Sequence, residues 1–364
     1  MNVFRVGGAV RDTLLGYPHH ETDWVVVGST PEEMIKNGFT QVGRDFPVFL
    51  HPVSKEEYAL ARTERKSGPG YRGFVVHADP SVTLEEDLER RDLTINAMAM
   101  DESGSIIDPY GGQADLEVKI LRHVSPHFVE DPLRVLRVAR FAARYHHFGF
   151  TVAEDTITLM AQIVNAGELP HLSTERIWLE TEKALGEQHP EVYWQVLANC
   201  GALTGLLPEL AVSQGISALS RAAPHTDRTD CRWAALLADL TEARAKNISE
   251  RFKAPNTYSV LAERVSDGRG KVKTALKDAS ECMTMLKALD ALRREEPFEG
   301  FCETLVALEQ SSVGAKGAID LLRSARNAAQ KVKAADFADQ GLIGPELGAA
   351  IRAAQIECIA RLLH

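Results

Sequence analysis

The chain has 364 residues, of which 45% are hydrophobic and 25% charged, and its formal net charge at pH 7 is −10. These values are typical of soluble globular proteins and allow two or more domains with a sizeable core. The acidic balance argues against a protein that coats nucleic acid non-specifically, although it permits a local basic groove.

Cysteine usage and hydropathy favour the cytoplasm. No stretch approaches the roughly 18 apolar residues of a membrane span, and the amino terminus lacks the apolar region of a signal peptide. The cysteines show no Cys-x-x-Cys spacing, which is typical of reduced structural thiols. They are Cys200, Cys231, Cys282, Cys302 and Cys358. We therefore expect a cytoplasmic protein.

The pattern of apolar residues changes near residue 130. Before it, short β-rich runs are separated by Gly, Pro and Asp. The expected strands are residues 2–6, 23–28, 47–52, 56–61, 94–100 and 105–110. After it, the helical period of 3.6 dominates. The clearest helical runs are residues 157–167, 174–186, 192–203 and 271–294. Residues 211–230 carry loop signals, and residues 341–348 carry loop or helix-boundary signals.

The first strand runs into Gly7-Gly8 and a short helix that Gly16 closes. Such a turn lets backbone N–H groups, here at Gly8, approach a phosphate, with Arg11 one turn into the helix. A plain tight turn is the alternative interpretation.

Glu21-Thr22-Asp23 leads directly into an apolar strand. If that strand extends back to Glu21, both carboxylates point to one side of the sheet. Oxygen ligands one residue apart suit Mg²⁺, and two such ions could activate an attacking hydroxyl and stabilise a pyrophosphate leaving group. A solvated turn is the alternative.

Residues 130–145 predict an amphipathic helix with an arginine face. At 100° per residue one side carries Arg134, Arg137, Arg140 and Arg144, and the other side is apolar. Asp131, which precedes Pro132, is also a good helix N-cap. The arginine face predicts a site for an anion.

Together the Gly-Gly turn, the Glu-x-Asp motif and the strand resemble the nucleotidyltransferase superfamily that includes DNA polymerase β. The string LERRDLTINA at 88–97 more closely resembles class II tRNA nucleotidyltransferases and bacterial poly(A) polymerases. The resemblance implies an α+β fold, with a polymerase-β-like head containing a small mixed sheet, followed by an all-helical neck, body and tail. The expected divisions are 1–140, 141–210 and 211–364.

In that family, Arg91 would contact the triphosphate and Asp92 the ribose. Asp131 and Arg134 would read the base edge, while arginines at 137 and 140 would contact the nucleotide. Guanidinium donors and carboxylate acceptors can together imitate a Watson–Crick partner for cytosine or adenine. Residues 172–185 resemble a further motif, in which Glu175, Arg176, Glu180 and Glu182 would brace the arginine helix.

Two segments distinguish members of the family. Residues 59–74 are basic and rich in glycine, which predicts a mobile loop between strands. Members of the family that complete the CCA end carry a loop in this region for the switch from CTP to ATP. Residues 43–52 lack the arginine-rich string of bacterial poly(A) polymerases. Both features favour CCA addition.

Two departures from the family are clear. Glu21 stands where relatives usually have Asp. Many proteobacterial relatives carry a phosphohydrolase domain with an adjacent His-Asp pair, but Ala238 precedes Asp239 here. His225 and Asp227 are interpreted as loop residues. We expect no phosphohydrolase activity.

The resemblance therefore implies addition of CCA to tRNA 3′ ends from CTP and ATP, with Mg²⁺ as cofactor. The helical remainder would bind the tRNA acceptor stem and elbow, and no obligate protein partner is evident. Candidate contacts are Lys271, Lys273, Lys277, Arg323, Arg326, Lys331 and Lys333, for which a solvated helix face is the alternative. The alternative functions are a poly(A) polymerase and a catalytically silent RNA-binding protein.

Overall fold

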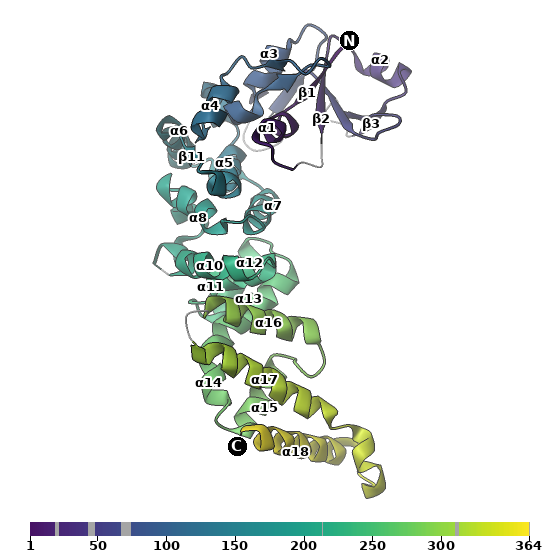
Figure 1. Cartoon of the computed structure of the whole chain (residues 1–364), viewed down its shortest axis with the longest axis vertical. Coiled ribbons are helices and arrows are strands. Elements are labelled where there is room, and N and C mark those ends of the chain that lie inside the picture. The colour runs from purple at the N-terminus through teal and green to yellow at the C-terminus, as the bar shows by residue number, and fades with distance from the viewer. Residues whose placement is uncertain (19–21, 43–47, 67–73, 213, 310–312, 364) are drawn as a thin grey trace. The chain divides into compact units, whose positions relative to one another are not determined.

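The computed structural model describes residues 1–18, 22–42, 48–66, 74–212, 214–309 and 313–363 (Figure 1). The chain divides into two compact units. Unit 1 comprises Met1–Ala184 and Val192–Leu206, and unit 2 comprises Leu185–Glu191 and Leu207–His364. In the described part of the chain, no helix is long and apolar enough to cross a membrane.

Unit 1 is built on a seven-stranded mixed sheet of order β3-β4-β5-β2-β1-β8-β9. Strands β2 and β5 pair in parallel, and the other neighbours pair antiparallel. The strands are β1 (Asn2–Val6), β2 (Asp23–Val27), β3 (Thr40–Val42), β4 (Val48–Leu50), β5 (Glu57–Leu60), β8 (Ala99–Met100) and β9 (Ile106–Ile107). The expected mixed sheet in an α+β head is confirmed.

Alternation along β2 places a core on each face of this sheet. Val25 packs with Val6 and Leu88 on one side. Val26 packs with Phe49 and other apolar side chains on the opposite side. Two further pairs of strands lie outside the sheet: β6 (Thr63–Lys66) with β7 (Phe74–His77), and β10 (Ile120–Leu121) with β11 (Thr151–Val152).

The helices of unit 1 follow the sheet in the chain or connect its strands. They are α1 (Gly8–Leu15), α2 (Pro31–Lys36), α3 (Leu84–Glu89), α4 (Gly112–Val118), α5 (Leu133–Tyr145), α6 (Glu154–Asn165), α7 (Thr174–Leu185), α8 (Pro190–Asn199) and α9 (Ala202–Leu206). As expected, Gly16 ends α1 in a left-handed conformation with φ of 63°.

In the described residues of unit 2, all regular secondary structure is helical. Its helices are α10 (Gly215–Ala222), α11 (Thr229–Leu237), α12 (Glu242–Arg251), α13 (Asn256–Gly268), α14 (Val272–Ala275), α15 (Ala279–Ala288), α16 (Glu295–Leu308), α17 (Val313–Lys331) and α18 (Gly344–Leu363). Trp233, Phe298 and Phe301 are fully buried in this unit, and α18 packs against α15 and α17 (Figure 1).

Four expectations about local structure need correction. Residues 94–100 are not one strand, because Thr94–Asn96 forms a 3₁₀ turn, η2, whose side chains bond to Asp115 and Asp92. The run 271–294 breaks at Asp278, which caps α15. Within 211–230, α10 forms because small apolar residues bury one side. Part of 59–74 is strand in β5, β6 and β7, and residues 67–73 lie outside the described residues.

Candidate functional site

The Gly7-Gly8 turn lies against the guanidinium of Arg91. Gly7 has φ of +67°, and a Cβ added there would lie 2.8 Å from Arg91 Nη1. A side chain at this position would therefore be strained and would displace the Arg91 guanidinium. Gly8 is the first residue of α1, so the Arg91 guanidinium lies near the N-terminus of this helix. Both the guanidinium and the helix N-terminus attract anions.

Arg91 is held in place by a buried carboxylate. Its Nη2 lies 3.2 Å from Asp87 Oδ2, and its Nη1 donates to the carbonyl oxygen of Asn96 at 3.4 Å. Burial by itself would raise the pKa of Asp87, but the charges of Arg90 and Arg91 lower it below the usual value. Asp87 therefore stays ionised and anchors both arginines.

Asp23 and Glu57 form an acidic pair at the start of two neighbouring strands. Asp23 opens β2 and is paired in parallel register with Glu57, which opens β5; both residues are exposed. Residues in register on strands about 4.8 Å apart project to the same face. Asp23 is also paired with Val6, which directly precedes the Gly7-Gly8 turn.

The structure does not describe Glu21, the other predicted metal ligand. The remaining described side chains contain no cluster of three or more His, Cys, Asp or Glu placed to hold a metal ion. Sequence reasoning missed Glu57 because parallel pairing brings together residues that are distant in the chain. The sequence signal that could have identified Glu57 is its acidic side chain at the start of an expected strand.

The arginine helix α5 begins after Asp131, as the capping motif predicts. Asp131 Oδ1 accepts a hydrogen bond from the Leu133 N–H at 3.0 Å, and its carbonyl accepts one from the Arg134 N–H at 3.0 Å. Arg176 from α7 lies 3.5 Å from the other carboxylate oxygen. The Asp131 carboxylate thus bonds to the first residue of α5, although Pro132 and not Asp131 occupies the N-cap position, and Arg176 contacts that carboxylate.

Two members of the arginine face are buried. Arg134 is 8% exposed and Arg140 is 7% exposed. Arg134 donates to the backbone carbonyls of His127, at 2.9 Å, and Arg90. Arg140 Nε donates to Glu180 Oε2 at 2.6 Å, which confirms the bracing role of Glu180. Helical periodicity identifies the face but not the elements that cover it.

The side chain of Arg137 is more exposed than those of Arg134 and Arg140, and it binds Asp92. Its side chain is 35% exposed, and its Nε donates to Asp92 Oδ2 at 2.7 Å. Asp92 Oδ1 accepts hydrogen bonds from Asn96 Nδ2 and the Leu93 N–H, each at 2.9 Å. Burial would raise the pKa of Asp92, but the charge of Arg137 and the hydrogen bonds from Asn96 and Arg137 hold it well below the usual value.

Arg11 lies in the interior and does not present its guanidinium at the surface. It is 3% exposed, and each of its three nitrogens has a partner. Nε and Nη2 donate to the two carboxylate oxygens of Asp12 at 2.8 and 2.9 Å, and Nη1 donates to Asn96 Oδ1. The Arg11 guanidinium therefore belongs to a buried network, of which Asn96 is a member that sequence reasoning missed.

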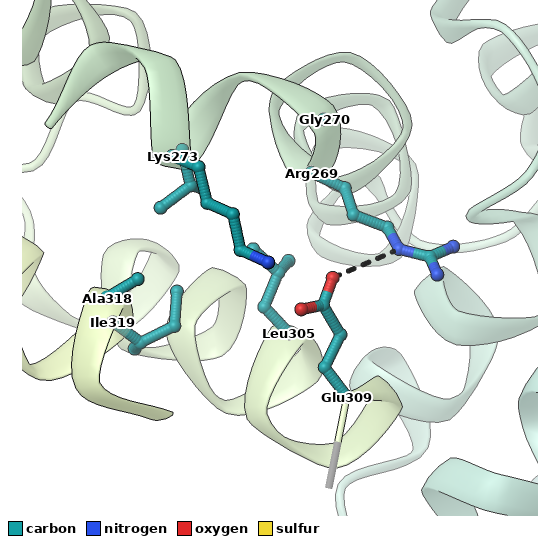
Figure 2. Close-up of a pocket in the computed structure, with 8 residues that line it drawn as sticks. Arg269, Gly270, Lys273, Leu305, Glu309, Ala318 and Ile319 are labelled. Atoms are coloured by element: carbon teal, nitrogen blue, oxygen red, sulfur yellow. Dashed lines mark ion pairs between the residues drawn. The ribbon is translucent and has the colours of Figure 1, made fainter. Parts of the chain in front are cut away.

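In unit 2, a pocket of about 210 Å³ carries two cations. Figure 2 shows Lys273 and Arg269 beside Glu309, with Leu305 and Ile319 among the apolar lining. Arg269 Nε lies 3.7 Å from Glu309 Oε1, and its Nη1 lies 2.8 Å from Asp239.

The predicted tRNA contacts in unit 2 differ in exposure. Arg326 is buried and donates to the carbonyl of Ala291 at 2.7 Å, and Arg323 pairs with Glu299 at 2.9 Å. Arg326 is therefore enclosed, whereas the side chain of Arg323 is 32% exposed and paired with a carboxylate. The exposed candidates are Lys271, Lys273, Lys277, Lys331 and Lys333.

Residues 3–122 match the family described as Poly A polymerase head domain, and residues 149–213 match the family described as a probable RNA and SrmB-binding site of polymerase A. A CCA-adding enzyme of Pseudomonas putida (strain W619) is 50% identical over 361 residues, covering 99% of this chain and 98% of the relative. A multifunctional CCA protein of Pseudomonas putida (strain KT2440) is 50% identical over 363 residues, which cover 99% of this chain and 98% of the relative.

Solved structures agree with this result. The Bacillus stearothermophilus CCA-adding enzyme in complex with CTP is 27% identical, with a TM-score of 0.68 over 99% of this chain and 89% of that chain. The Thermotoga maritima CCA-adding enzyme complexed with tRNA is 22% identical, with a TM-score of 0.71 over 100% of this chain and 90% of that chain. At this identity the comparison shows a shared fold. The chain belongs to the family of CCA-adding enzymes.

Proposed function

We propose that this protein adds CCA to tRNA 3′ ends, using CTP and ATP and releasing pyrophosphate. The observation that carries the proposal is the 50% identity to a CCA-adding enzyme along 99% of this chain. The Arg137–Asp92 ion pair and the placement of Arg91 at the Gly7-Gly8 turn support it, because they supply fixed polar groups for a nucleotide, with Arg91 beside a helix N-terminus.

The acidic strand edge fits a divalent cation. Nucleotidyltransferases of this family generally use divalent metals. Asp23 and Glu57 offer hard oxygen ligands on one face of the sheet, and Glu21 is two residues from Asp23. We assign Mg²⁺ to these three carboxylates; when bound, it would lower the pKa of the attacking tRNA hydroxyl and offset the charge of the phosphates.

The nucleotide contacts divide by chemistry. The N-terminus of α1 at Gly8, together with Arg91, would bind the triphosphate, and Asp92 would accept a hydrogen bond from the ribose. Asp131 and Arg134 would read the base. The two backbone carbonyls that Arg134 binds would fix the orientation of its guanidinium.

The remaining predicted contacts have different roles. Arg137, the more exposed arginine, would contact the nucleotide together with Asp92. Arg140 would act by holding α5 to α7 through Glu180. A head at 1–140, a neck at 141–210 and a body at 211–364 remain our proposed division, with tRNA phosphates bound by the exposed lysines of unit 2.

The test uses a tRNA that lacks its CCA end, incubated with each labelled nucleotide. We expect two CMP and one AMP to be added, and addition to stop there. Continued addition of AMP would identify a poly(A) polymerase, and no incorporation would identify a silent RNA-binding protein. We also expect no phosphohydrolase activity, because Ala238 precedes Asp239 and Asp239 pairs with Arg269 at 2.8 Å.

A further inference from the structure

Four buried side chains connect the far end of α5 to the nucleotide-contacting pair Asp92 and Arg137. Tyr145 donates to Asp12 Oδ1 at 2.8 Å, Asp12 binds the Arg11 guanidinium, Arg11 donates to Asn96 Oδ1, and Asn96 donates to Asp92 at 2.9 Å. The set Tyr145, Asp12, Arg11 and Asn96 is termed the buried relay. It links α5, α1 and η2 and returns to α5 at Arg137.

Arg11 determines which way the Asn96 amide faces. The carbonyl oxygen of this amide accepts from the Arg11 cation, so the NH₂ group is directed to Asp92. The reversed amide would place NH₂ against a guanidinium and oxygen against a carboxylate, which loses both hydrogen bonds. The orientation of Asn96, and with it one side of Asp92, therefore depends on Arg11.

Arg11 is itself held by several contacts. Asp12 binds it through both carboxylate oxygens, a fork geometry that lysine cannot reproduce. The guanidinium carbon lies 4.9 Å from the ring centroid of Tyr145 and 5.2 Å from that of Phe141. Burial raises the pKa of Tyr145, so its hydroxyl keeps the proton that it donates to Asp12.

We propose that the buried relay positions Asp92 and Arg137 for the nucleotide. Its members touch neither substrate, and they act by fixing the rotamer of Asp92 from the side opposite Arg137. The proposal rests on the proposed function, because it takes Asp92 and Arg137 as nucleotide contacts. It assigns Arg11 a positioning role in place of a phosphate contact.

The test is a double-mutant cycle on the dissociation constant for CTP, measured calorimetrically with the full chain. We expect Arg11→Lys and Arg137→Lys each to weaken CTP binding by about tenfold, and the double variant to lose little more than either one, because coupled residues are not additive. Binding of tRNA should stay within about twofold, since a positioning defect is local to the nucleotide. If the double variant weakens CTP binding by the product of the two single effects, the relay proposal is overturned.

Tyr145→Phe provides a second variant that keeps the ring and removes one hydroxyl. We expect Tyr145→Phe to weaken CTP binding by about threefold. Combined with Arg137→Lys, it should weaken CTP binding little more than Arg137→Lys does alone. The matched control is Tyr193→Phe, which also removes a buried hydroxyl, 3.2 Å from Thr181 Oγ1. It should change thermal stability similarly and leave CTP binding unchanged; equal effects of the two variants on CTP would overturn the proposal.

The binding assay separates this inference from the proposed function. A wild-type protein that binds CTP but adds no nucleotide to tRNA would refute the proposed function, while the cycle still tests the relay. If Arg137→Lys leaves CTP binding unchanged, Arg137 is not a nucleotide contact and the relay proposal is overturned with it. If Arg11→Lys does not fold, the Tyr145→Phe cycle decides.

Discussion

Arg140 on α5 and Glu180 on α7 form an ion pair of 2.6 Å, with side chains that are both more than nine-tenths buried. This pair joins the arginine helix to the motif at 172–185. Removing one partner from a buried pair leaves an uncompensated charge. We therefore expect Glu180→Ala to lower the free energy of unfolding by about 3–5 kcal/mol.

The measurement is urea denaturation followed by tryptophan fluorescence and circular dichroism. Lys183→Ala on the same helix is the control, because Lys183 is exposed and exposed substitutions usually change stability by less than about 0.5 kcal/mol. Equal effects of the two substitutions would show that the pair contributes no more than a surface contact.

The pKa of Asp92 predicts a pH dependence of stability. In the folded protein this pKa is below the ordinary value of 3.8, so the ionised carboxylate stabilises the fold above pH 3.8 and the contribution is lost as the pH falls further. We expect Asp92→Asn to be less stable than wild type by about 3 kcal/mol at neutral pH. The difference in denaturant midpoint between the two proteins should shrink progressively as the pH falls below 3.8; a constant difference would contradict the linkage.

The metal assignment predicts that Asp23→Asn and Glu57→Gln each lower incorporation by about a hundredfold or more, because each removes a charged ligand of the cation. Thermal stability and tRNA binding should stay near wild type, since both side chains are exposed. Glu56→Gln is the matched control from the neighbouring position. Incorporation within about tenfold of wild type would remove that residue from the metal site.

Base selection separates the roles of Arg134 and Arg137. We expect Arg134→Ala to reduce discrimination of CTP and ATP from UTP and GTP by roughly tenfold or more, as loss of a bidentate contact does. Arg137→Ala should weaken CTP and ATP alike. Because Arg134 is buried against two carbonyls, its variant also loses stability, so unfolding is measured in parallel. Unchanged specificity in Arg134→Ala would mean that base selection lies elsewhere.

Local signals in the sequence predicted much of the site. Gly7-Gly8 followed by an apolar run predicted the strand, turn and helix that the structure contains, and the Asp131-Pro132 pair predicted the start of α5. These features depend on the backbone preferences of a few neighbouring residues. The family resemblance added the two-part organisation, with a mixed-sheet head and helices after it.

Long-range contacts could not be predicted in the same way. The burial of Arg134 and the enclosure of Arg11 arise from carbonyls and side chains far along the chain. The pairing of Asp23 with Glu57 depends on strand order, which hydrophobic alternation does not specify. The role of Asn96 could not be predicted for a related reason. A polar residue in a run that resembles a strand does not indicate which distant side chains it will bind.

Helix α5 is fastened along its whole length to different parts of unit 1. Arg134 binds the carbonyl of Arg90, Arg137 binds Asp92, Arg140 binds Glu180 and Tyr145 binds Asp12. A slide of the helix along its axis would break all four contacts together, so such motion should be rare on the timescale of a catalytic cycle. We expect any motion that accompanies the change from cytosine to adenine to consist of side-chain rotation, with α5 acting as a rigid reference for both bases.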